Sequence, residues 1–296
     1  LSYGKSWEGI STDRLVRLLT LLSDRMDQIS ASVLVELLDG ILVKEIWPVD
    51  SDFIYKVVTA QPQFEKRPNH NSTHVYHWHR VCGKLVSRDS KRAMPLLDVL
   101  LRQMSNDHGL SYDHYIAPLA QALCRINPTA AWEIVASHLL STAPKWRGDL
   151  LHWLQGRIGG FDERDAVPPI AEFPLPPILD WIAQAPEDRV SMIAHCAPYS
   201  LDDEYGGALT RALLAKYRNV DGVIGGISAN FHSGGWSGPE SQYLRKKRER
   251  LRVWLGKGFD QNVVSWIEDE ISSLDRQIEA SEISEERESW NRPSGA

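Results

Sequence analysis

Residues 239–278 of the 296-residue chain read PESQYLRKKRERLRVWLGKGFDQNVVSWIEDEISSLDRQI. Both halves of this stretch are typical of helices, and a glycine-containing turn, GKGFD at 256–260, separates them. In the second half, apolar residues recur at steps of three, four, three and four, at Val264, Ile267, Ile271, Leu274 and Ile278. This spacing predicts a long helix that packs along one side. The stretch therefore predicts an antiparallel helical hairpin that reverses near Gly258.

The first helix of this hairpin carries a strongly basic run at 245–252, in which Glu249 is the one acidic residue. Such a run could bind phosphate groups with an affinity that falls as salt rises. A reversal near Gly258 would also bring acidic residues opposite the run, and the expected pairs are Glu268 with Arg248, Asp269 with Lys247, and Glu270 with Lys246. We interpret the basic run as neutralised within the hairpin, with a nucleic-acid or partner surface as the alternative.

The turn before this helix, SGGWSGPES at 233–241, contains glycines and serines but matches neither a phosphate loop nor a nucleophile elbow. No Gly-Lys-Ser/Thr follows the glycines, and Pro239 stands where the elbow pattern needs glycine. Ser237 and Glu240 instead predict a capping box, with the helix beginning near residue 238. We expect Trp236 to anchor the turn, while the backbone reverses at Gly234, Gly235 and Gly238.

Helical spacing extends over nearly all of the preceding chain. Behind the cap candidates Ser11 and Thr12, apolar stripes lie at 15–22, 33–41, 51–60, 73–87, 90–105, 112–126, 129–142, 147–155, 177–185, 187–196, 203–218 and 220–230. Two helices with their loops occupy about 35 to 45 residues, the unit length of HEAT-like and armadillo-like repeats. The sequence predicts an all-α protein, an irregular α-solenoid of helical hairpins that ends in a long hairpin cap.

A long interruption at 156–177, with three glycines and five prolines, divides this pattern. We expect an N-terminal helical-repeat array at 1–155, a Pro/Gly-rich loop or junction at 156–177, further repeats at 178–232, and a C-terminal capping hairpin with an acidic tail at 233–296.

Composition narrows the classes of function. A hydrophobic fraction of 43% without a bilayer-length apolar run or a signal peptide predicts a cytoplasmic globular protein. Because the chain begins with Leu1, we expect it to be part of a longer protein, with any catalytic domain outside it. The formal charge of −6 argues against general nucleic-acid affinity. Three widely spaced cysteines, Cys82, Cys124 and Cys196, suit buried thiols in a reducing compartment.

The densest cluster of ligand-type side chains is HNSTHVYHWHR, which contains His70, His74, His77 and His79. Three of these imidazoles could hold zinc, but no HExxH, paired cysteine or nearby carboxylate accompanies them. We interpret the cluster as a polar helix face and predict no metal, no cofactor and no catalytic residue in the chain. The remaining acid and base candidates have no nucleophile beside them in the sequence: Asp107, His108, Asp113 and His114.

The C-terminal third resembles the end of helical-repeat regions in large bacterial multidomain proteins, including STAND-type NTPases and related anti-phage defence proteins. The motifs that carry the resemblance are a Trp followed by PEDR (Trp181, Pro186, Glu187, Asp188, Arg189), the turn FxSGxWSGPxS (Phe231, Ser233, Gly234, Trp236, Ser237, Gly238, Pro239, Ser241) and a closing helix with Trp266, Ile271, Glu285 and Glu286. The resemblance implies a non-catalytic recognition or scaffold region that binds a protein ligand or other domains of its own polypeptide. A nucleic-acid-binding repeat module that uses 245–252, or a small metalloenzyme built on the histidines, remains the alternative. We predict no membrane association, and the sequence does not indicate an oligomeric state.

Overall fold

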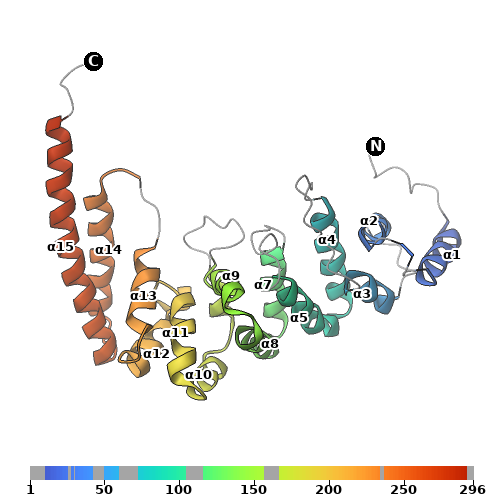
Figure 1. Cartoon of the computed structure of the whole chain (residues 1–296), viewed down its shortest axis with the longest axis horizontal. Helices are drawn as coiled ribbons and strands as arrows, with labels where there is room; N and C mark the ends of the chain where they lie inside the picture. Colours follow the sequence, from blue (N-terminus) through green and yellow to red (C-terminus); the bar gives the residue numbers. More distant parts are fainter. Residues whose placement is uncertain are drawn as a thin grey trace. The chain divides into compact units, whose positions relative to one another are not determined.

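A computed structural model describes residues 11–25, 28–29, 31–42, 50–59, 73–104, 116–156, 167–233 and 237–291. Throughout these ranges the regular elements are helices, and no strand occurs among them (Figure 1). This confirms the all-α class that the apolar spacing predicts. The chain divides into two compact units: unit 1, Leu1–Arg164 with Glu172–Pro174, and unit 2, Asp165–Ala171 with Leu175–Ala296.

Unit 1 is built from short helices that pack on their neighbours in the chain. Its α-helices are α1 (Thr12–Ser23), α2 (Ala31–Leu42), α3 (Ser51–Thr59), α4 (Thr73–Arg88), α5 (Ala93–Met104), α7 (Ile116–Ile126), α8 (Pro128–Ser141) and α9 (Pro144–Leu154). Helix α4 packs against α2 and α3, and α5 packs against α7 and α8. Buried tryptophans add hydrogen bonds between helices, because the indoles of Trp78 of α4 and Trp153 of α9 donate to the carbonyl oxygens of Val58 of α3 and Ala117 of α7 at 3.0 and 3.3 Å.

In unit 1, the start of α8 shows how residues at a helix end stabilise it. The Asn127 side chain accepts a hydrogen bond from the backbone N–H of Ala130 at 3.2 Å, and Pro128 occupies the first turn of α8. The side chain therefore satisfies a donor that the helix itself leaves unpaired, and proline loses nothing at this position.

Unit 2 holds α10 (Leu175–Ala183), α11 (Pro186–Cys196), α12 (Gly207–Tyr217), α13 (Val223–His232), α14 (Glu240–Leu255) and α15 (Gln261–Asn291). Helix α13 packs against α11 and α12, while α15 packs against α12 and along α14 (Figure 1). The predicted C-terminal hairpin is thus present as α14 and α15.

A glycine brings α13 close to α11. A Cβ at Gly226 would lie 3.0 Å from the carbonyl carbon of Ala194, which leaves no room for a larger residue. Four residues later, the buried Asn230 amide donates to the carbonyl oxygens of Ala194 and Ala197, both at 3.0 Å. These contacts satisfy carbonyl groups at the end of α11 and fix the two helices together.

Several helix bounds differ from those expected. Helix α10 begins at Leu175, so the loop predicted at 156–177 ends earlier, and Pro176 and Pro177 lie in the first helical turn, where proline is tolerated. The stripe at 203–218 is divided by Gly206, whose φ of 76° ends a short 3-10 helix before α12 begins. Residues 157–166, inside the predicted loop, lie outside the described ranges.

Candidate functional site: the C-terminal helical hairpin

The buried face of α15 is rotated from the predicted one. Its buried residues are Val263, Trp266, Ile267, Glu270, Leu274, Ile278 and Ser281. Val264 and Ile271, both expected on the packed side, are only half-buried. Helix α15 packs against both α14 and α12 and also contacts α13, whereas the predicted stripe allows for a single packed side. A carboxylate, Glu270, consequently lies in the packed face.

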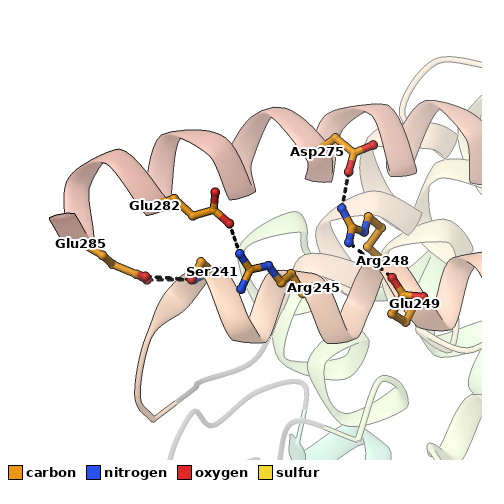
Figure 2. A network of polar contacts seen from close by, with 7 residues as sticks. All are labelled: Ser241, Arg245, Arg248, Glu249, Asp275, Glu282 and Glu285. Atoms are coloured by element: carbon orange, nitrogen blue, oxygen red, sulfur yellow. Dashed lines mark hydrogen bonds and ion pairs between the residues drawn. The ribbon is translucent and has the colours of Figure 1, made fainter.

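Three cations of the basic run of α14 pair with carboxylates, two of which, Asp275 and Glu282, lie on α15 (Figure 2). Arg245 pairs with Glu282. The Arg248 guanidinium reaches Asp275 at 2.7 Å and Glu249 at 3.4 Å. Arg252 also pairs with Glu249, at 2.9 Å. The hairpin therefore neutralises arginines of the run, as the internal interpretation expects.

The predicted pairs themselves are wrong. Asp269 pairs instead with Arg218 of α12 at 2.6 Å, and Glu270 lies against α13. The turn itself lies where it was expected, because Gly258 is midway between Leu255, where α14 ends, and Gln261, where α15 begins. Counting equal distances from the turn does not take account of the side of each helix on which a residue lies. Glu268 is exposed, and Arg248 meets Asp275 instead.

Three other cations of the run have different surroundings. The Lys247 ammonium donates to the Phe231 carbonyl at the end of α13 at 2.9 Å and lies over the Tyr243 ring, 4.6 Å from its centroid. Lys246 and Arg250 are exposed. Arg250 contributes a favourable charge to Asp202, whose pKa falls: burial opposes the shift, but Lys257, Trp254 and Arg250 outweigh it.

The start of α14 is capped from the other helix of the hairpin, not by the predicted capping box. Helix α14 begins at Glu240, and no side chain caps it from position 239. The backbone N–H and hydroxyl of Ser241 donate to the Glu285 carboxylate of α15 at 3.0 and 2.8 Å (Figure 2). These hydrogen bonds lower the pKa of Glu285. The Glu240 side chain accepts from Ser281 at 2.9 Å instead of reaching back to Ser237.

A half-buried polar cluster around the buried Glu270 joins α13 to α15. His232 Nε2 lies 2.7 Å from one oxygen of Glu270, and the Ser228 hydroxyl donates to the other. Trp266 Nε1 donates to the same hydroxyl at 3.2 Å. Burial favours the neutral carboxyl, but hydrogen bonds from His232 and Ser228 outweigh it, so the pKa of Glu270 lies below its ordinary value. In this cluster the carboxylate bridges serine and histidine, so the histidine is not placed to activate the serine as in a catalytic triad.

Sequence reasoning missed this cluster. The available signal was a glutamate in register with Val263, Trp266, Ile267 and Leu274, which is a polar position on an otherwise apolar helix face. Buried carboxylates of this kind need partners, and here Ser228 and His232 lie one helical turn apart on α13.

The residues that carry the family resemblance have structural contacts in unit 2. Arg189 donates to the Trp181 carbonyl and to Gln184, each at 2.8 Å, and lies 4.7 Å from the Trp181 ring centroid, so it holds the end of α10. The Phe231 ring packs edge-on against Trp266 with centroids 5.9 Å apart. Ser233 caps α13 by donating to Asn230 at 2.6 Å. Gly234 and Trp236 lie outside the described residues.

The histidine cluster is only partly described. His70 and the side chain of His74 lie outside the described part of the chain. His77 Nδ1 lies 2.6 Å from the buried Asp39 carboxylate of α2, and Arg80 approaches the other oxygen of Asp39 at 3.4 Å. His77 thus joins α4 to α2 and does not simply face water. Where side chains are described, no group of three or more His, Cys, Asp or Glu residues could hold a metal ion.

The other sequence candidates are readily placed. Asp107, His108, Asp113 and His114 lie outside the described residues. The three cysteines are free and buried, as expected. Burial raises the pKa of Cys124 and Cys196 to about 12 and that of Cys82 well above its usual value, so these thiols remain protonated and unreactive.

Comparison with known proteins found no matching family model, no matching curated protein and no matching solved structure. Among the described helices, none combines the length and apolar character needed to cross a lipid bilayer.

Proposed function

We propose that this chain is a non-catalytic recognition or scaffold region of a larger bacterial protein, built as an irregular α-solenoid, and that it binds a protein ligand in anti-phage defence. One observation carries this proposal: the charged and potentially reactive side chains of the chain contact neighbouring helices. Arginines of the basic run, the buried Glu270 and His77 all contact neighbouring helices. Side chains engaged in this way support architecture and leave a broad helical surface for binding.

Recurring contacts support the solenoid arrangement. Among the described residues, a histidine contacts a carboxylate on another helix in three places: His77 with Asp39, His138 with Asp98, and His232 with Glu270. The two partners are 38, 40 and 38 residues apart in the sequence. This separation is close to the length of a two-helix repeat. It is expected if, within unit 1 and within unit 2, a helix packs against the corresponding helix of the next repeat. The buried, protonated thiols also suit a cytoplasmic location.

The experiment that tests this function uses phage escape. Bacteria that express the full protein containing this chain are challenged with a phage panel, and escape mutants are sequenced. We expect escape substitutions to gather in one phage protein. Calorimetry should then show that the wild-type phage protein binds the purified 296-residue chain and that the escape variant does not. Equal binding of both variants, or binding of neither, would contradict the proposal.

A nucleic-acid-binding module is the second candidate, and the exposed Lys246 and Arg250 favour it. Both side chains could reach phosphate groups without breaking an ion pair across the hairpin. The formal charge of the chain is −6, however, and carboxylates already pair with three cations of the run, Arg245, Arg248 and Arg252. Salt dependence separates the two candidates, because phosphate binding weakens steeply as salt rises.

A further inference from the structure

Two large apolar side chains are exposed among the described residues of unit 2, one on each helix of the hairpin. Val253 of α14 is 64% exposed and Ile283 of α15 is 46% exposed. Single exposed apolar residues are common on protein surfaces and by themselves indicate nothing. These two, however, each lie within a patterned set of charges.

On α14, charged residues lie three or four positions before and after Val253. Arg250 precedes it by three residues, Glu249 precedes it by four and Lys257 follows it by four, so all lie along one edge of the helix and its following turn. All of these side chains are exposed. Glu249 and Lys257 also make contacts within the chain, to Arg248 and Arg252 and to Asp202 respectively. We call this set, with Val253, the α14 edge.

Charged residues also surround Ile283 on α15, and their signs are opposite to those at the matching positions around Val253 when the two helices are read in opposite directions. Glu279 precedes it by four residues, Glu286 follows it by three and Arg287 follows it by four. These side chains are also exposed and share one edge of α15. We call this set, with Ile283, the α15 edge.

The two edges are complementary when they are placed antiparallel with Val253 against Ile283. Counting outward from these residues along both helices then brings the following charges opposite each other: Arg250 with Glu286, Lys257 with Glu279, and Glu249 with Arg287. Each of these pairs has opposite signs. A parallel arrangement fails, because it places Arg250 against Ala280 and Glu249 against Glu279.

We propose that the α14 edge of one copy of this chain binds the α15 edge of a second copy. Within one chain these edges do not meet, because α14 and α15 pack through other sides, with Arg248 against Asp275. The contact joins two unlike surfaces, so repetition would produce a ring or an open chain of copies. One pair of helix edges buries less than the ~1,200 Å² of a stable interface, so the association is weak and sensitive to salt.

Sedimentation velocity of the full 296-residue chain tests the proposal. At about 20 mM NaCl the wild-type chain associates as concentration rises, and at about 500 mM NaCl it associates much less. V253E and I283K each weaken the association by about tenfold or more, because each places a charge at the centre of the contact. R250E and E286R also weaken it, and the double variant R250E/E286R recovers most of the wild-type association because the pair is restored in reverse.

The matched control is L140E, since Leu140 of α8 is 49% exposed and lies on neither edge. Its association should equal that of the wild-type chain, and thermal unfolding of each variant establishes that the substitutions leave the fold intact. A wild-type chain that remains monomeric at about 100 µM in low salt overturns the proposal. Association that survives V253E and I283K, or that R250E/E286R does not restore, also overturns it.

Discussion

At the scale of single residues, Glu270 shows how a charged side chain can stabilise an interior position. It is 7% exposed, and its two oxygens meet His232 and the Ser228 hydroxyl of α13. Trp266 in turn donates to Ser228, which fixes the hydroxyl. A buried carboxylate without such partners would be strongly unfavourable. The cluster therefore makes the contact between α13 and α15 specific as well as apolar.

Removing the Glu270 carboxylate should destabilise unit 2. In Glu270→Ala, the half-buried Ser228 hydroxyl and His232 ring lose their acceptor, at a cost of about 1 to 3 kcal/mol. Urea unfolding followed by circular dichroism measures this change. The matched control is Glu279→Ala on the exposed side of the same helix, which should change the free energy of unfolding by less than about 0.5 kcal/mol. Equal effects of the two substitutions would exclude the cluster as a stabilising feature.

Glu270 also predicts how stability depends on pH. Its pKa in the folded chain is below the ordinary value of about 4.3, so the stability that it contributes is fully present above that value. This contribution is lost as the pH falls through the folded pKa, because the carboxylate must then take up a proton. Unfolding free energies measured from pH 7 to pH 3 should fall less steeply for Glu270→Gln than for the wild-type chain. Parallel curves would contradict this assignment.

Sequence alone could not predict this residue's role. An antiparallel hairpin reversing near Gly258 placed Glu270 opposite Lys246. Its burial depends on Ser228 and His232, which come from a helix about 40 residues earlier and whose placement no local pattern reveals.

At the scale of helices, the C-terminal hairpin depends on register. Apolar spacing was sufficient to predict two antiparallel helices and their turn, whereas the ion pairs depend on which side of each helix faces the other. Residues at equal distances from the turn do not all lie on the facing sides. Arg248 therefore meets Asp275, seven residues beyond the expected Glu268, and Arg245 meets Glu282.

A double-mutant cycle tests this register. Arg248→Ala and Asp275→Ala should show a coupling energy of about 0.5 to 1 kcal/mol in urea unfolding, because each removes the other's ionic partner. The matched cycle with Glu268→Ala should show no coupling to Arg248. Coupling to Glu268 rather than Asp275 would restore the register expected from the sequence.

The capping of α14 by α15 gives a second prediction at this scale. In Glu285→Ala the Ser241 N–H loses its acceptor, so the first turn of α14 should open more readily. Hydrogen exchange of the amides at 241–243 should become several-fold faster, while the amides near Leu251 should be unchanged. Ser237→Ala is the control. Because Ser237 does not form a capping box, this substitution should leave the exchange rates of these amides unchanged. Faster exchange in Ser237→Ala alone would favour the capping box.

At the scale of the whole molecule, composition and spacing were sufficient to predict an all-helical chain with free, buried cysteines. The solenoid arrangement and the recognition role remain proposals. They depend on surfaces formed by residues far apart in the sequence, such as the helices that His77 and His138 join to their neighbours. The spacing of apolar residues within one helix does not indicate what such surfaces bind.

One measurement tests most directly whether the chain is a protein-recognition scaffold or a nucleic-acid-binding module. It is the binding of fluorescently labelled DNA and RNA to the chain across a salt series. With Arg245, Arg248 and Arg252 paired with carboxylates, the chain should bind these probes weakly, with Kd above about 100 µM at about 150 mM salt, and Lys246→Glu should change nothing. Micromolar binding that falls linearly with the logarithm of salt concentration, and that Lys246→Glu and Arg250→Glu weaken, would contradict a protein-recognition scaffold and establish a nucleic-acid-binding module.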